Sequence, residues 1–146
     1  MAETEREGVR GRVAVLVAGA AAVVLASSPA RSFEEAVAKA NFSKEVADCT
    51  AYYTWSERYA EKLNHPEQAE QFGKSKDWSF GLLMMVKSQP SDFTKIKAEV
   101  AEAVSRMDAM GENEAADKLP QTYQDLCDDL VQHPEMRYKY WTEKSD

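Results

Sequence analysis

The chain contains two cysteines, Cys49 and Cys127, which lie 78 positions apart. With only two cysteines, the connectivity of a disulfide is fixed if one forms. A bridge of this span would close a long loop and, by reducing the entropy of the unfolded chain, stabilise the fold by about 4 to 5 kcal/mol. Whether the thiols are oxidised depends on the compartment, which the first 30 residues indicate.

Residues 1–30 have the features of a secretory signal peptide. An uncharged apolar run of 14 residues, Val13 to Ala26, follows Arg6, Arg10 and Arg12 and precedes Ser28-Pro29-Ala30. Fourteen helical residues reach about 21 Å, less than the ~30 Å hydrocarbon core of a bilayer. We therefore expect cleavage after Ala26 or Ala30 and export to the periplasm or the extracellular space. Oxidised cysteines are expected there.

Two alternatives to cleavage remain open, because three glutamates among the first seven residues balance the arginines of the head. Residues 13–26 could stay as an uncleaved membrane anchor, or form an ordinary buried or interfacial helix. In a reducing compartment, the two cysteines would be separate buried thiols. A redox-active pair is not indicated, because neither cysteine belongs to a Cys-x-x-Cys motif or follows a basic residue.

The charge balance argues against nucleic acid as a partner. The chain has 18 basic and 25 acidic residues, a formal net charge of -7, and removal of residues 1–30 leaves that charge unchanged. Binding to a phosphate backbone depends on clustered Lys and Arg, and no such cluster is evident. Residues 31–146 have the length and the ordinary globular composition of a single domain.

From Ser32 onward, apolar residues recur at steps of three and four, which predicts α-helices. A capping box at Ser32 to Glu35 marks the start of the first helix, although Ser43 offers a second start after a break near Asn41. The core-facing stripe of the first helix is expected to comprise Phe42, Val46, Cys49, Tyr53, Ser56, Ala60 and Leu63.

Proline and glycine divide the rest of the helical region. Pro66 begins a second helix, Ser91 caps a third, and Gly111 ends the third in a left-handed conformation. Pro120 should lie in the first turn of a fourth helix or kink it, and His133-Pro134 stops that helix. The prediction is an all-α fold: a small antiparallel bundle of about four helices, with the disulfide joining the first helix to the last.

The second helix is apolar on nearly every side from Phe80 to Val86. Such a helix is usually the most buried one, or it leaves a face for another chain. Gly73 and Gly81 inside it each cost about 1 kcal/mol of helix propensity relative to alanine. Close backbone approach or a local break is therefore expected at these glycines.

Aromatic residues exceed the needs of a small core and predict a contact surface. A second stripe on the first helix, formed by Tyr52, Trp55 and Tyr59, lies about 100° from the core stripe. This aromatic stripe either packs under a neighbouring helix or the tail, or binds a partner. The tail from Met136 to Trp141 alternates aromatic and basic residues, which indicates an extended segment along the first helix. The residues expected to bind another protein are Tyr52, Trp55, Tyr59, Tyr138, Tyr140 and Trp141. We expect the tail to dock near Tyr52 and Trp55.

The leading functional hypothesis is an exported binding or accessory protein that acts through protein contact, without catalysis. One alternative is a small-molecule carrier or enzyme with a pocket inside the bundle between Tyr53, Trp78 and Met85. Another, in which residues 13–26 stay as an anchor, is an accessory subunit of a membrane complex. No cofactor is predicted, and no metal site, because His65 and His133 lie at helix boundaries. Asn41 is a glycosylation site only in a eukaryotic secretory pathway.

Overall fold

The computed structural model describes residues 29–87 and 92–144. The expected signal peptide and the expected cap at Ser91 lie essentially outside these ranges. The described residues form five helices: α1 (Pro29–Lys62), α2 (Pro66–Lys87), α3 (Asp92–Asp108), α4 (Glu112–Gln132) and α5 (Pro134–Glu143). The prediction of an all-α fold is confirmed, and a fifth helix is added to the expected four. None of the helices described is long and apolar enough to cross a bilayer.

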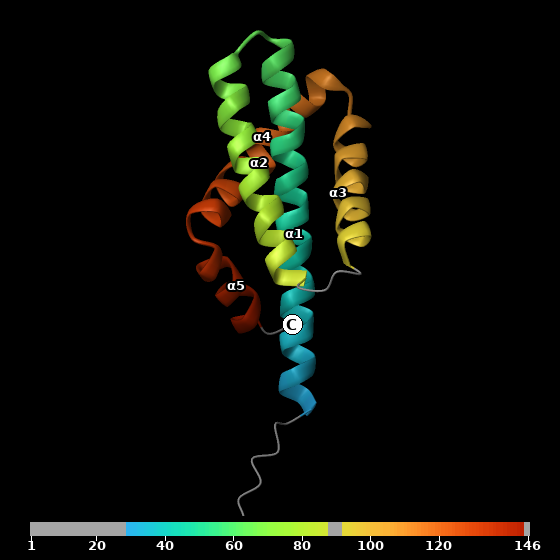
Figure 1. Ribbon diagram of the computed structural model, residues 1–146, viewed down its shortest axis with the longest axis vertical. Helices are drawn as coiled ribbons and strands as arrows, with labels where there is room; N and C mark the ends of the chain where they lie inside the picture. Colours follow the sequence, from blue (N-terminus) through green and yellow to red (C-terminus); the bar gives the residue numbers. More distant parts are fainter. Residues whose placement is uncertain (1–28, 88–91, 145–146) are drawn as a thin grey trace, which may run out of the picture.

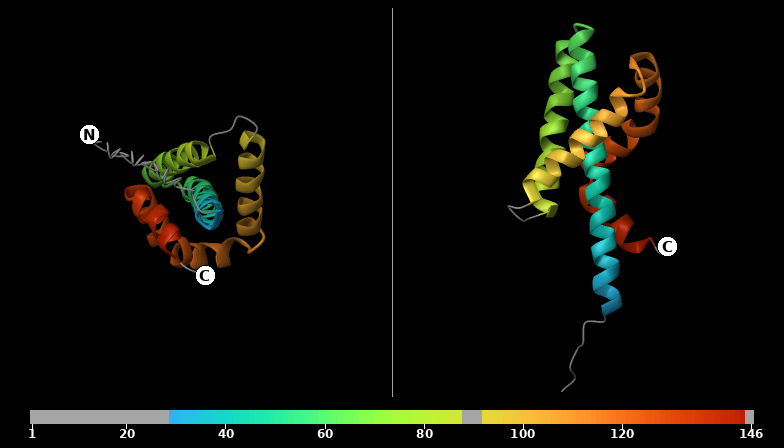
Figure 2. Two further views of the ribbon diagram at one scale, coloured as in Figure 1. Left: turned by 90° about the horizontal axis from the view of Figure 1, so that it is seen from below. Right: turned by 90° about the vertical axis from the view of Figure 1, so that its right-hand side faces the viewer.

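The long helix α1 is the central element of the fold. Seen end-on, the other four helices are arranged around it (Figure 2, left). α2 runs back antiparallel along α1, whereas α3 crosses α1 obliquely (Figure 2, right). The first end of α1 projects beyond the other helices (Figure 1). The arrangement is therefore a helical bundle around one axial helix, and it is less regular than the expected up-and-down bundle.

α1 is continuous over its 34 residues, so the expected break near Asn41 is wrong. The helix begins at Pro29, three residues before the expected capping box, and no glycine or further proline interrupts it. The predicted core stripe is confirmed from Phe42 to Ala60, but Leu63 lies exposed at the end of the helix.

A Schellman motif ends α1. The amide of His65 donates to the carbonyl of Ala60, the amide of Asn64 donates to that of Glu61, and Asn64 has a φ of 57°. Asparagine tolerates this left-handed conformation better than most residues. Pro66 then begins α2, as predicted.

The predictions made from glycine and proline in the later helices are confirmed only in part. The expected positive φ of Gly111 is confirmed at 79°, although α3 already ends at Asp108. Pro120 lies inside α4 and not in its first turn, because α4 starts at Glu112. α2 continues through Gly73 and Gly81, so a break at either glycine is excluded.

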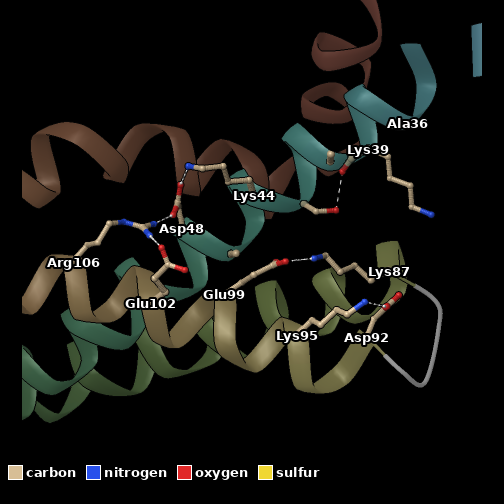
Figure 3. Close-up of a pocket in the computed structure, with 13 residues that line it drawn as sticks. Ala36, Lys39, Lys44, Asp48, Lys87, Asp92, Lys95, Glu99, Glu102 and Arg106 are labelled. Atoms are coloured by element: carbon tan, nitrogen blue, oxygen red, sulfur yellow. Dashed lines mark hydrogen bonds and ion pairs between the residues drawn. The ribbon is translucent and has the colours of Figure 1, made fainter. Parts of the chain in front are cut away.

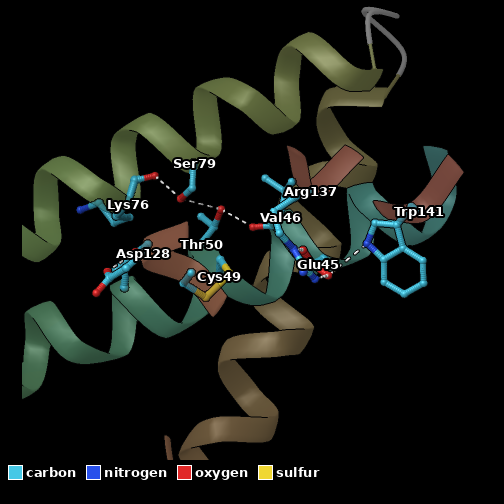
Figure 4. Close-up of a disulfide and its surroundings, with 11 residues drawn as sticks. Glu45, Val46, Cys49, Thr50, Lys76, Ser79, Asp128, Arg137 and Trp141 are labelled. Carbon is cyan, nitrogen blue, oxygen red and sulfur yellow. Dashed lines mark hydrogen bonds and ion pairs between the residues drawn. A yellow bond between two sulfur atoms is a disulfide. The ribbon is translucent and has the colours of Figure 1, made fainter. Parts of the chain in front are cut away.

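The disulfide between Cys49 and Cys127 is present and joins α1 to α4, with a Cα–Cα distance of 5.4 Å (Figure 4). Both cysteines are fully buried among the apolar residues of the core. Next to them, Thr50 donates a hydrogen bond of 3.0 Å to the hydroxyl of Ser79, which in turn donates to the carbonyl of Lys76. The core beside the disulfide therefore contains polar groups whose hydrogen-bonding capacity is used within the chain.

The extended tail predicted after His133 is wrong, because this segment is the helix α5. Only His133 separates α4 from α5, and Pro134 occupies the first helical position, where its missing amide costs no hydrogen bond. The tail does lie against α1, as expected, but near Phe42 and Glu45 and not near Tyr52 and Trp55. The rings of Phe42 and Tyr138 meet edge to face, with centroids 5.4 Å apart.

Candidate functional site

The second aromatic stripe of α1 is largely enclosed by the chain itself. Tyr52 and Trp55 are buried, and Tyr59 is half-buried. Tyr52 stacks on Tyr123 of α4 with centroids 5.9 Å apart, and Trp55 stacks on Tyr59 at 4.8 Å. An exposed strip is therefore not available at Tyr52 and Trp55. Tyr52 and Trp55 instead agree with the alternative prediction, in which this stripe packs under neighbouring parts of the chain.

The aromatic residues of α5 are more accessible. Tyr140 is exposed, whereas Tyr138 and Trp141 are half-buried. The indole Nε1 of Trp141 donates a hydrogen bond of 3.0 Å to Glu45 (Figure 4). Trp141 is thereby held against α1 while part of its ring stays open to solvent.

The three residues expected to line an internal ligand pocket are not brought together. Tyr53 is buried in the core and donates a 3.0 Å hydrogen bond to Asp128 of α4. Trp78 and Met85 lie exposed on α2. Burial, and secondarily the hydrogen bond to Asp128, raises the pKa of the Tyr53 hydroxyl. This tyrosine therefore acts as a neutral donor that links α1 to α4.

A groove between the first half of α1 and α3 is the largest hollow that we describe, with a volume of about 730 Å³ (Figure 3). It forms because the oblique path of α3 leaves space beside α1. We call it the α1–α3 groove. The residues that line it are Ala36, Lys39, Ala40, Ser43, Lys44, Ala47, Asp48, Lys87, Asp92, Lys95, Glu99, Glu102 and Arg106.

The floor of the groove is made of small side chains on α1. Ala36, Ala40, Ser43 and Ala47 recur at steps of four, three and four, which places them on one stripe of the helix. The hydroxyl of Ser43 donates a hydrogen bond of 2.8 Å to the carbonyl of Lys39. The floor is therefore narrow and largely apolar, without a hydroxyl free to donate.

The walls of the groove are charged, and the charges are paired both within one helix and between helices. Arg106 of α3 contacts Asp48 of α1 at 2.9 Å and Glu102 at 3.1 Å, and Lys44 also contacts Asp48, at 3.0 Å (Figure 3). Further along, Lys87 of α2 contacts Glu99 of α3 at 2.6 Å. The walls therefore present charges of both signs, most of them in ion pairs.

A smaller hollow of about 200 Å³ lies on the other side of the Lys44–Asp48 pair. These two residues line both hollows, so the hollows adjoin across α1. Tyr123 and Leu126 of α4 and Trp141 of α5 line the smaller one. One residue predicted to bind a partner, Trp141, therefore lies next to the groove.

This arrangement is suited to recognition. Nine of the 13 residues that line the groove are charged, whereas small-molecule pockets are mostly apolar with a few polar groups. Among residues 29–87 and 92–144, no set of three or more His, Cys, Asp or Glu side chains is placed to hold a metal ion. The groove therefore offers a shaped apolar floor between two charged walls.

The sequence alone did not reveal the groove. The alanine and serine stripe was visible as a helical repeat, but small residues on a helix also occur on solvated faces. Arg106 and Asp48 are 58 positions apart, so their pairing depends on how α3 crosses α1. The chain matches no protein-family model, no curated protein and no solved structure. The functional argument therefore rests on the geometry of the groove.

Proposed function

We propose that this chain is an exported, non-catalytic binding protein, and that the α1–α3 groove holds an amphipathic helix of its protein partner. The observation that carries the proposal is the small-residue floor between charged walls. Alanine and serine let the axis of a second helix come close to α1, since interaxial distances depend on the side chains at the contact. The apolar face of the partner helix would lie on this floor.

The charged walls supply specificity in this proposal. Arg106, Asp48 and Glu102 are already oriented by one another, so little side-chain freedom is lost when a partner binds. A partner helix with mixed charges on its flanks can pair with both signs. Exposed ion pairs add little affinity, so the affinity depends on apolar contact with Ala36 and Ala40, the two exposed residues of the floor, and the walls set the register.

The test replaces one residue of the floor. Ala40 is exposed in the groove, so Ala40→Arg fills the floor without disturbing the core. The matched control is Ala98→Arg, which adds the same charge at an exposed position of α3 outside the groove. Each variant is recovered from its native compartment, and the co-purifying proteins are quantified.

We expect at least one protein to be depleted tenfold or more with Ala40→Arg and retained with Ala98→Arg. The same set of proteins with both variants, at unchanged yield, would contradict the proposal. Circular dichroism of both variants establishes that the fold is intact.

Export is tested by the intact mass of the same material. Cleavage after Ala30 would remove only the first two residues of α1, so the mature domain would keep its groove. A mass that retains residues 1–30 would instead favour the alternative of an anchored subunit of a membrane complex. A mass increase of two hydrogens on reduction reports the disulfide.

A further inference from the structure

The charges that line the α1–α3 groove do not balance. Five of the lining residues are basic and four are acidic, whereas the whole chain has 18 basic and 25 acidic residues. Each of the four carboxylates already forms an ion pair with a basic residue of the groove. The groove therefore carries a surplus of positive charge in a chain whose formal net charge is -7.

The surplus lies at the end of the groove where α3 begins. Among residues 29–87 and 92–144, the ammonium group of Lys39 has no ion-pair partner. Lys95 reaches Asp92 only at 4.0 Å, and its side chain is 74% exposed. The other three basic residues of the groove contact their carboxylates at 3.1 Å or less. Figure 3 shows Lys39 and Lys95 at the same end of the groove, so two cations are available there to a partner.

The accessible part of the apolar floor lies at this same end. Ala36 and Ala40 are exposed, whereas Ser43 and Ala47 are buried. Lys39 follows Ala36 by three positions and directly precedes Ala40, so its side chain flanks the exposed floor. A helix that contacts the two alanines therefore comes within reach of the uncommitted ammonium group.

We propose that the partner helix is acidic where it lies on Ala36 and Ala40, with Asp or Glu on its flanks that pair with Lys39 and Lys95. This inference rests on the proposed function, because it specifies the helix that the groove holds. A carboxylate beside Lys39 forms an ion pair that the described part of the chain does not supply. Lys or Arg on the same flanks would place a like charge beside Lys39 and find the carboxylates of the groove already paired.

The charge of the rest of the chain strengthens this preference. Outside the groove, acidic residues outnumber basic ones, so an acidic helix is repelled there and directed toward the groove. Farther along the groove, toward Arg106 and Asp48, charges of both signs are paired, and flanks of either sign are accepted. The preference for acidic flanks is therefore confined to the end at Lys39.

The test uses a displayed library of amphipathic helices that share one apolar face of Ala and Leu and carry Glu, Gln or Lys at each flanking position. The library is selected in parallel on the purified, oxidised chain and on the double variant Ala36→Gln, Ala40→Gln. This variant covers the exposed floor with longer polar side chains and changes no charge. We expect the helices that are enriched only on the wild type to carry more Glu than Lys on their flanks.

The affinity of one selected helix is then compared with that of the same helix in which every flanking Glu is Lys. The Glu form should bind roughly tenfold more tightly at about 50 mM salt, and most of the difference should be lost at about 500 mM, because exposed charges are screened.

A charge reversal in the groove supplies the matched comparison. Lys39→Glu should weaken binding of the selected helix roughly tenfold. The control Lys97→Glu makes the same change of charge at an exposed position of α3 that does not line the groove, and it should leave the affinity unchanged. Both side chains are exposed, so both variants should keep the wild-type circular dichroism spectrum.

The outcomes separate this inference from the proposed function. Enriched helices without an excess of Glu, lost on the double variant, would overturn the acidic partner and leave the groove as a binding site for helices. Equal effects of Lys39→Glu and Lys97→Glu would also overturn it, since only the overall charge would then matter. If no helix is enriched, or if enrichment persists on the double variant, both the acidic partner and the groove are contradicted.

Discussion

Arg137 of α5 holds Glu45 of α1 through two hydrogen bonds, Nε to Oε1 at 2.8 Å and Nη2 to Oε2 at 2.7 Å. The Glu45 side chain is only 8% exposed and that of Arg137 19%. The hydrogen bond to Glu45 raises the pKa of the Arg137 guanidinium. Because Trp141 also donates to Glu45, one carboxylate joins two residues of α5 to the central helix.

Replacing Arg137 with methionine should therefore release α5. The carboxylate of Glu45 would stay nearly buried with Trp141 as its remaining donor, a loss of about 3 kcal/mol. Amide hydrogen exchange in α5 should accelerate at least tenfold, whereas exchange in α2 stays unchanged. The double variant Glu45→Met, Arg137→Met should recover most of the protection, because it leaves no buried charge. Equal exchange rates in the single variant and the wild type would contradict this account.

Removing the disulfide should be the costliest change to the core. The Cys49→Ala, Cys127→Ala variant loses the constraint on a loop of 78 residues, which is worth about 4 to 5 kcal/mol in the unfolded state. Urea unfolding should show this decrease in the free energy of unfolding. The reduced wild type should unfold at a urea concentration similar to that of the variant. A difference below 1 kcal/mol between the oxidised wild type and the variant would show that the unfolded chain gains little freedom.

Stability should fall at alkaline pH through the buried tyrosines. Burial raises the pKa of Tyr52, Tyr53 and Tyr123 above 10, the value for tyrosine in an unfolded chain. The stability that each hydroxyl contributes is fully present below pH 10. It is lost as the pH rises toward the folded-state pKa, because the unfolded chain releases its proton first.

The variant Tyr53→Phe isolates one of these contributions. Between pH 9 and pH 11, its free energy of unfolding should fall by about 1.4 kcal/mol less than that of the wild type. At pH 7 the variant should be about 1 kcal/mol less stable, because the hydrogen bond to Asp128 is lost. Urea unfolding at each pH provides the measurement. Parallel pH profiles for the two proteins would show that Tyr53 ionises equally in both states.

The two glycines of α2 should respond differently to alanine. Gly81→Ala should stabilise the fold by about 1 kcal/mol, since helix propensity rises and nothing in the described part of the chain opposes the methyl group. Gly73→Ala should gain less, because Glu57 must move and its 2.6 Å contact with Lys76 is disturbed. Thermal unfolding at low protein concentration compares the two. A larger gain at Gly73 than at Gly81 would refute this assignment.

The helices and the disulfide could largely be predicted from the sequence. The helices follow from the local spacing of apolar residues, and the pairing of the disulfide follows from the count of two cysteines. The residues of the core stripe from Phe42 to Ala60 are spaced at steps of three and four, which place them on one face only if the segment is a helix. Two cysteines allow only one pairing. The boundary at Pro66 was equally visible. These elements needed no knowledge of how the helices pack.

The rest depended on packing between distant residues. The tail was wrongly predicted as extended because alternation of aromatic and basic residues over six positions fits a strand as well as a helix. In the structure this segment is a helix that packs on α1, where Arg137 binds Glu45, 92 positions away. Likewise, the groove arises from the angle at which α3 crosses α1, and no local pattern encodes that angle.

The bridge between Cys49 and Cys127 also has a consequence for proteolysis. The exposed turn at Asn64 lies inside the loop that the bridge closes. A protease that cuts the backbone there would leave two fragments still covalently joined, with α1 held to α4. Such a nicked molecule would migrate as one band without reductant and as two with it. In a compartment rich in proteases, a single cut would therefore not separate the central helix from the helices packed around it.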